Sequence, residues 1–143
     1  MVSNSNLAVL ERVDVLSLLA DKEMQSLADS LYEMVFKPEE TIYLKDSPAE
    51  ACYIIKRGVV RHSNNEKTTA LFKRGDLFGE MEVLDCDKNR VATAIAVTEV
   101  VLLAILKEDL LFFLNERPSV EMQIRNNILR RHAKNIATIF HNA

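Results

Sequence analysis

The sequence predicts an α+β fold, an antiparallel β-roll of the jelly-roll type with helices at its N-terminal and C-terminal ends. Three observations support this prediction. Between residues 37 and 106, short runs rich in Val, Ile, Thr and Tyr alternate with polar turns, which is typical of antiparallel strands. Apolar residues recur at helical spacing before this region and after it. The longest apolar run, residues 100–106, is far shorter than the roughly 20 residues that a membrane-spanning helix needs.

Residues 7–36 are predicted to form the N-terminal helices. Leu7, Leu10, Val13, Leu16 and Leu19 recur at intervals of three, which places them on one helical face. Asp21 is expected to cap a second helix, because an aspartate side chain accepts hydrogen bonds from the first free N–H groups. The apolar stripe of this second helix is Met24, Leu27, Leu31 and Met34.

Six runs in the central region are predicted to be strands, and two turns connect them. The runs are residues 41–44, 52–55, 59–63, 68–72, 91–98 and 100–106. Asn64-Asn65 predicts a hairpin, because asparagine tolerates a positive φ. Gly58 supplies the freedom for a second tight turn. From Lys107 the helical period returns and stops before Pro118, and a last helix is expected from Pro118 to about residue 140.

Length and composition indicate one globular domain over residues 1–143, with helices at about 7–36, the roll at about 37–106 and C-terminal helices at about 107–140. The chain is 48% hydrophobic and 27% charged, which excludes a disordered or low-complexity protein. The polar N-terminus has no signal-peptide pattern. We therefore expect a cytoplasmic location, either as a separate protein or as the cytoplasmic part of a membrane protein.

Charge is distributed unevenly along the chain. The net charge is -3, yet residues 117–143 hold five basic residues and one acidic residue, a net +4, so the remainder carries -7. An acidic body argues against generic nucleic-acid binding by the domain. The basic last helix fits either an acidic partner or lipid surface, or a face exposed to water.

Neither a metal site nor an enzymatic site is predicted. The two cysteines, Cys52 and Cys86, and the three histidines, His62, His132 and His141, do not have metal-ligand spacing. No nucleophile stands beside a recognisable general base. We therefore expect a binding protein without a metal or cofactor.

The stretch from Phe78 to Thr93 has the strongest functional signal. It contains Gly79-Glu80 and, after a polar insert, Arg90. A carboxylate accepts hydrogen bonds from sugar hydroxyls, and a guanidinium presents paired donors to phosphate oxygens. Glycine permits close approach of the backbone, and a short helix after it would direct free N–H groups at an anion.

This pattern, in this order of elements, resembles the cyclic nucleotide-binding domain family over roughly residues 9–139. The resemblance rests on Pro38, residues 53–60 (YIIKRGVV), residues 75–80 (GDLFGE) and residues 90–93 (RVAT). It implies that residues 79–90 form a phosphate-binding cassette, in which Glu80 accepts from the ribose 2′-hydroxyl and Arg90 pairs with the cyclic phosphate. The implied ligand-binding residues are Gly79, Glu80, Met81, Glu82, Val83, Arg90, Val91 and Ala92.

The resemblance also implies a regulatory function. The domain is expected to bind a cyclic nucleotide and to transmit binding through its C-terminal helices to an effector domain or protein, with no direct DNA binding from this chain. A homodimer through the last helix is a further expectation. In the family a hydroxyl directly after the arginine favours guanine, and Val91 has none. The expected ligand is therefore cyclic AMP.

Glu82 departs most from the family pattern, which has a small residue there. A carboxylate about 6 Å from the phosphate would be repelled by roughly 3 kcal/mol at an effective dielectric of ~20. A charge-assisted bond from Arg90 contributes only about 1.5 to 3 kcal/mol. Glu82 is expected to turn to solvent or to pair with Lys88 or Arg90. The alternative function is a degenerate module that no longer binds nucleotide and serves in interaction or structure.

Two milder departures fall in early turns. Glu39 follows Pro38, and Asp46 precedes Ser47, where the family has glycines. Both are expected to affect loop geometry, because aspartate in particular is tolerated in turns.

Overall fold

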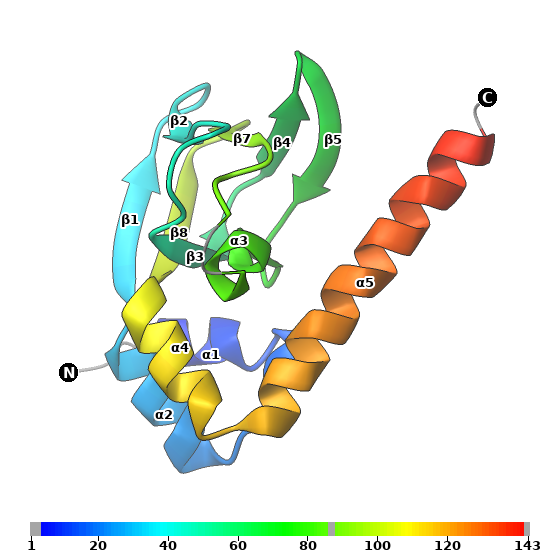
Figure 1. Cartoon of the computed structure of the whole chain (residues 1–143). Coiled ribbons are helices and arrows are strands. Elements are labelled where there is room, and N and C mark those ends of the chain that lie inside the picture. The colour runs from blue at the N-terminus through cyan, green and yellow to red at the C-terminus, as the bar shows by residue number, and fades with distance from the viewer. Residues whose placement is uncertain (1–3, 86–87, 142–143) are drawn as a thin grey trace.

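The computed structural model describes residues 4–85 and 88–141, and it confirms the predicted α+β roll (Figure 1). Eight antiparallel strands form two four-stranded sheets, ordered β1-β8-β3-β6 and β2-β7-β4-β5. The strands are β1 Tyr32–Phe36, β2 Thr41–Tyr43, β3 Ala51–Arg57, β4 Val60–Asn64, β5 Lys67–Phe72, β6 Leu77–Phe78, β7 Thr93–Ala96 and β8 Val100–Leu106. The helices are α1 Asn4–Leu10, the 3-10 turn η1 Asp14–Leu16, α2 Asp21–Asp29, α3 Glu80–Leu84, α4 Lys107–Asn115 and α5 Pro118–His141.

Strand β8 is the centre of the first sheet, with β1 on one side and β3 on the other. All of its residues from Val100 to Ile105 are buried. Because the strand is covered on both faces, its sequence is a continuous apolar run. The short β6 adds to the far edge of β3 by pairing Phe78 with Tyr53. The sheet thereby carries the chain directly to Gly79.

The β4–β5 hairpin turns one residue later than the sequence predicted. Its central residues are Asn65 and Glu66, with φ values of 52° and 66°. Two successive positive φ values match the right-handed twist of the strands in a two-residue hairpin. The expectation for Asn65 is confirmed, and Asn64 instead ends β4.

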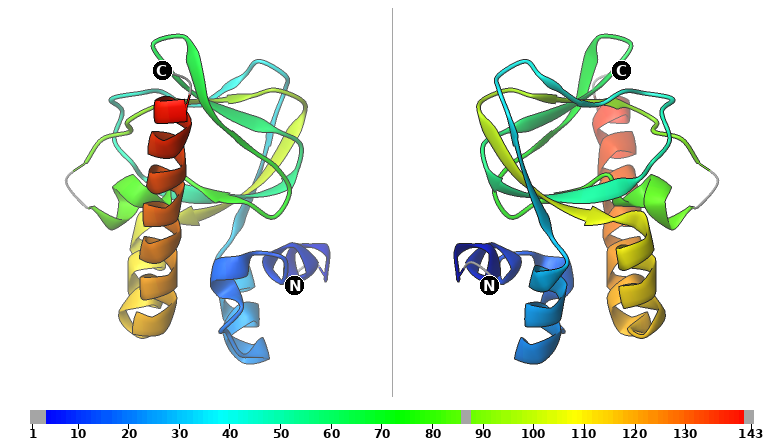
Figure 2. Two further views of the ribbon diagram at one scale, coloured as in Figure 1. Left: turned by 90° about the vertical axis from the view of Figure 1, so that its right-hand side faces the viewer. Right: turned by 90° about the vertical axis from the view of Figure 1, so that its left-hand side faces the viewer.

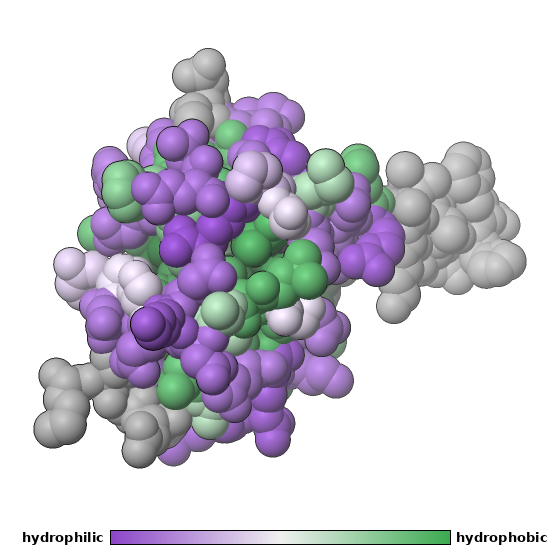
Figure 3. Space-filling view, turned by 90° about the horizontal axis from the view of Figure 1, so that it is seen from below, coloured by the Kyte–Doolittle hydropathy of each residue, from purple (hydrophilic) through white to green (hydrophobic). Residues whose placement is uncertain are grey.

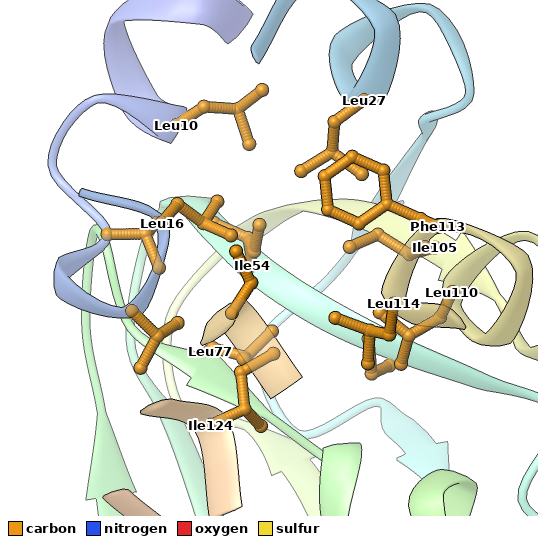
Figure 4. Close-up of a cluster of buried hydrophobic side chains, with 14 of the residues drawn as sticks. Leu10, Leu16, Leu27, Ile54, Leu77, Ile105, Leu110, Phe113, Leu114 and Ile124 are labelled. Atoms are coloured by element: carbon orange, nitrogen blue, oxygen red, sulfur yellow. The ribbon is translucent and has the colours of Figure 1, made fainter. Parts of the chain in front are cut away.

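Two hydrophobic clusters divide the interior. One lies between the sheet and the helices, where labelled side chains such as Leu10, Leu27, Ile54 and Phe113 converge (Figure 4). The other fills the roll and includes Phe78 and Leu102. Seen from below, hydrophobic residues gather between polar ones on the helical face (Figure 3). The helices therefore cover the sheet that leads to the Gly79 turn.

The helical prediction for residues 7–36 is wrong over its last part, and it is also wrong between α1 and α2, where only the short turn η1 is helical. Helix α2 ends at Asp29, and Tyr32–Phe36 form the edge strand β1, paired with β8. The helical spacing of Leu31 and Met34 is coincidental, and the run of aromatic and β-branched residues favours a strand. The N-cap of α2 is Ala20 rather than Asp21, which is the first helical residue. Glu23 satisfies the Ala20 N–H at 3.1 Å.

The last helix, α5, runs from the base of the molecule past α3 and away from the sheets (Figure 1 and Figure 2). Its first turns are anchored, because Val120 and Ile124 are buried in the helical cluster. No helix in the part of the chain that the structure describes has both the length and the apolar character to cross a membrane.

An ion pair fastens the start of α5 to α2 and predicts a pH effect. Glu23 accepts a hydrogen bond from the Ala20 N–H and another from Arg117 at 2.5 Å, and these contacts lower the pKa of its carboxyl. A carboxyl whose pKa is lowered on folding stabilises the folded state at pH values above its ordinary pKa. This stabilisation is lost as the pH falls through the pKa of the folded state. We expect Glu23→Gln to reduce the loss of stability between about pH 6 and pH 3, measured by urea unfolding. An identical pH dependence in both proteins would contradict this role.

Candidate ligand-binding site

A sharp turn at Gly79 joins β6 to the short helix α3 and shapes the site. Gly79 has φ 76°, in the left-handed region that side chains disfavour. A Cβ at this position would lie 2.8 Å from Arg90 Nη1 and 3.4 Å from the Tyr43 hydroxyl. Both the backbone conformation and the close packing therefore require glycine.

We predict that Gly79→Ala destabilises the domain by about 1 to 3 kcal/mol. The left-handed conformation alone costs roughly 1 to 2 kcal/mol for a residue with a Cβ, and Arg90 must also shift. Chemical unfolding followed by circular dichroism measures the change. Gly75→Ala is the matched control, since its φ is also positive at 88° but its Cβ would meet only Arg12 atoms at 3.5 Å or more. Equal destabilisation by the two variants would exclude a contribution from the Arg90 contact.

Arg90 is buried beneath this turn, with a relative exposure of 2%. Its Nη1 donates to the Gly79 carbonyl at 2.6 Å, and its Nη2 donates to the Ala51 carbonyl. The guanidinium also lies over the Tyr43 ring, with its central carbon 4.0 Å from the ring centroid. In this arrangement Arg90 ties the cassette to strand β3.

The backbone of Arg90 is held by one of the early turns. Asp46 N–H donates to the Arg90 carbonyl at 2.8 Å, and Arg90 N–H donates to the Ser47 carbonyl at 2.9 Å. Asp46 has φ 72° and Glu39 has φ 70°, so both positions use the conformation that glycine favours. The departure at Asp46 thus lies in a turn that positions the Arg90 backbone.

Glu82 pairs with Arg90, one of the three outcomes that the sequence left open. The Glu82 carboxylate lies 3.4 Å from Arg90 Nη1, and the two side chains are 4% and 1% exposed. Lys88 instead pairs with Asp85 at 3.4 Å. The departure from the family pattern is therefore a buried ion pair inside the cassette.

A cavity of about 260 Å³ lies beside the cassette. Six of the predicted site residues line it: Gly79, Glu80, Met81, Glu82, Val91 and Ala92. Val83 points instead into the helical core with 0% exposure. Arg90 lies behind Gly79 and Glu82, outside the set of described residues that line the cavity.

The far wall of the cavity was not predicted. It comes from the β4–β5 hairpin and from helix α5, through His62, Asn64, Thr69, Ala70, Phe72 and Ile128. Residues 59–63 and 68–72 were predicted to be strands, but no residue type there indicated a ligand. Ile128 is an apolar residue of the last helix, and only the packing of α5 past α3 brings it to the cavity.

An aromatic cluster lies behind the far wall of the cavity, to which it contributes His62 and Phe72. Phe78 stacks on Phe72 and Tyr53, at centroid distances of 5.2 Å and 5.4 Å. His62 meets Phe72 edge-on at 4.8 Å and shares a hydrogen bond with the Tyr43 hydroxyl. Tyr43 thus connects the cavity wall to the guanidinium of Arg90.

Burial governs the protonation of the neighbouring acidic groups. Desolvation raises the pKa of the Cys52 thiol to about 12, and it also raises the pKa of the Tyr53 hydroxyl, although the charge of Arg90 opposes both effects. Both groups therefore stay protonated near neutral pH. Cys86 and the side chains of His132 and His141 lie outside the described residues. Among the residues that are described, no three His, Cys, Asp or Glu side chains are grouped to hold a metal ion.

The arrangement suits binding. Glu80 and Glu82 are buried carboxylates that line the cavity, the Arg90 guanidinium lies behind Glu82, and none of these groups is a nucleophile beside a base.

Known proteins show the same combination of sequence and fold. The chain is 37% identical over 95 residues to a cAMP-dependent protein kinase regulatory subunit of Aspergillus niger, covering 65% of this chain and 23% of that protein. It is 31% identical over 118 residues to the cyclic AMP receptor protein of Thermus thermophilus, covering 79% and 54%. The chain thus spans between about a quarter and a half of the length of these relatives.

A solved structure extends the comparison to nearly the whole fold. The regulatory subunit of a cAMP-independent protein kinase A from Trypanosoma brucei superposes with a TM-score of 0.80 at 27% identity, covering 94% of this chain and 48% of that one. Residues 33–117, more than half of the chain, also match the family model of the cyclic nucleotide-binding domain. These residues include the strands of the roll, the cassette and Arg90, and the chain belongs to the cyclic nucleotide-binding domain family.

Proposed function

We propose that this chain is a regulatory domain that binds cyclic AMP in the cavity beside the cassette. The observation that carries the proposal is the convergence of Glu80, Glu82, Val91 and Ala92 on one cavity with Arg90 directly behind it. Relatives named for cyclic AMP support the choice of ligand.

Each end of the cavity has a proposed role. Glu80, 1% exposed, accepts from the ribose 2′-hydroxyl, because a buried carboxylate favours a hydroxyl donor. Arg90 turns from its carbonyl partners to the cyclic phosphate, and backbone N–H groups of α3 and of Val91 to Ala92 add donors. The base extends toward His62 and Phe72 on the opposite wall.

Adenine is the proposed base. Val91 follows Arg90 and is 46% exposed on the cavity side of the loop, but its side chain has no hydroxyl to donate to guanine. A binding site that lacks a polar partner for a buried polar group discriminates against the ligand that carries it.

Transmission is proposed to run through α5. Ile128 lines the cavity while Val120 and Ile124 of the same helix are buried in the helical core. A ligand that contacts Ile128 more favourably in one helix position shifts the population toward that position. The effector, a homodimer through α5 and the cytoplasmic location remain predictions for the whole protein.

Calorimetric titration of the chain with cyclic AMP and cyclic GMP tests the proposal. We expect saturable binding of cyclic AMP, with weaker binding of cyclic GMP. Cyclic CMP provides the matched control for the base. Absence of binding by all three ligands would contradict the proposed function, and equal affinities would contradict the base preference alone.

The alternative function, a module that no longer binds nucleotide, rests on one observation. This observation is the buried ion pair between Glu82 and Arg90. If this pair is permanent, Arg90 is not available to a phosphate. Titration of Glu82→Ala distinguishes the two functions. Binding that appears only in this variant supports the non-binding module, whereas binding by both proteins supports the sensor.

A further inference from the structure

We propose that the Glu82 carboxylate occupies the position beside the Arg90 guanidinium that an anionic ligand would take. The binding of an anionic ligand by Arg90 is then coupled to the uptake of one proton by Glu82. This inference rests on the proposed function of the cavity. It concerns a residue at which the chain departs from its family, and it makes ligand affinity depend on pH.

The first step of the argument is geometric. Arg90 Nη1 is shared between the Gly79 carbonyl at 2.6 Å and the Glu82 carboxylate at 3.4 Å. Glu82 also lines the cavity. A phosphate that reaches the guanidinium from the cavity must therefore approach on the side where the Glu82 carboxylate now lies.

The second step is electrostatic. With both side chains at most 4% exposed, water screens the Glu82 carboxylate and the Arg90 guanidinium only weakly. When Arg90 turns to a phosphate, the Glu82 carboxylate loses its cation and faces a new anion, and both changes favour a neutral side chain at this position.

The proton balance follows. A proton from the buffer joins a Glu82 carboxylate oxygen as the ion pair opens, and the neutral carboxyl then donates a hydrogen bond where the anion would have been repelled. No covalent bond in the ligand changes. Affinity for an anion should therefore rise as the pH falls, by up to about tenfold per pH unit.

Other titratable groups surround the cassette. Cys52 and Tyr53 of β3 have raised pKa values and stay protonated at neutral pH. His62 of β4 is the competing candidate, because an imidazole ordinarily titrates near pH 6.5. Among the described residues, the charged and titratable groups around Glu82 are Glu80 of α3 itself, Asp85 at its end, Arg90, the roll residues Tyr43, Cys52, Tyr53 and His62 and, on α5, Arg125.

The experiment is calorimetric titration with cyclic AMP between about pH 5.5 and pH 8, in pairs of buffers with different enthalpies of ionisation. We expect uptake of about one proton per ligand at neutral pH. Glu82→Gln should bind more tightly than the unmodified chain at pH 8 and should lose the proton uptake. His62→Asn should retain it.

Three results would overturn the inference. They are cyclic AMP binding with equal heats in both buffers, an unchanged pH slope in Glu82→Gln, and loss of proton uptake in His62→Asn. If neither the unmodified chain nor Glu82→Gln binds cyclic AMP at any pH, the proposed function itself fails and this inference fails with it.

Discussion

Replacing Arg90 with alanine is expected to weaken cyclic AMP binding by at least about 100-fold. Charge-assisted hydrogen bonds contribute about 1.5 to 3 kcal/mol each, a guanidinium offers two to a phosphate, and 1.4 kcal/mol corresponds to tenfold. Calorimetric titration measures the change. The same substitution should also destabilise the fold by about 3 to 5 kcal/mol, because Glu82 is left buried without its cation.

A paired substitution separates the two effects. In Arg90→Ala with Glu82→Ala, both buried charges are removed, so part of the lost stability should return while binding stays weak. The matched single variant is Glu82→Ala, which keeps the cation. If the paired variant bound cyclic AMP as tightly as Glu82→Ala, Arg90 would have no place in the proposed site.

The roll could be predicted because its signals are local. Short β-branched runs and positive-φ turns depend on neighbours in sequence, and six of the eight strands were recognised from them, with shifted boundaries. Strand β1 was missed, because Leu31 and Met34 continue the spacing of α2 by coincidence. Strand β6 has only two residues, Leu77 and Phe78, and its pairing with β3 has no signature in so short a segment.

The cassette side of the cavity was predictable for a different reason. Gly79, Glu80 and Arg90 are close in sequence and chemically distinctive, so their spacing indicated both the turn and the ligand chemistry. The opposite wall depends on tertiary packing. His62 and Ile128 are separated by 66 positions in the chain, and they meet at the cavity only because α5 passes beside α3.

The orientation of Arg90 also lay beyond sequence reasoning. A phosphate-binding arginine was expected to face the cavity, yet its guanidinium contacts the carbonyls of Gly79 and Ala51 and the Glu82 carboxylate. The physical reason is that a buried cation needs acceptors, and these are the acceptors that the β6–α3 turn and the edge of β3 present. Glu82 was recognised as the decisive departure, but only the fold selects Arg90 over Lys88 as its partner.

Phe78→Ala is expected to destabilise the fold by about 3 to 5 kcal/mol. The side chain is 0% exposed and contacts Tyr53 and Phe72 by stacking, with His62 edge-on at 5.9 Å. Truncating a buried phenylalanine removes its transfer free energy and leaves a cavity. Urea unfolding followed by circular dichroism gives the free energy of unfolding.

Phe78 also lies next to the candidate site, so the loss of its side chain should affect the site as well as the stability of the fold. It immediately precedes Gly79, and its ring also lies 6.3 Å from that of Tyr43, which supports the Arg90 guanidinium. Phe112→Ala is the matched control, because Phe112 is 71% exposed and its truncation should change stability by only about 0.5 kcal/mol. The free energy of unfolding of Phe78→Leu should lie between those of Phe78→Ala and Phe112→Ala, since leucine fills part of the space that the phenyl ring leaves. Similar unfolding free energies for Phe78→Ala and Phe112→Ala would contradict this packing role of the Phe78 ring.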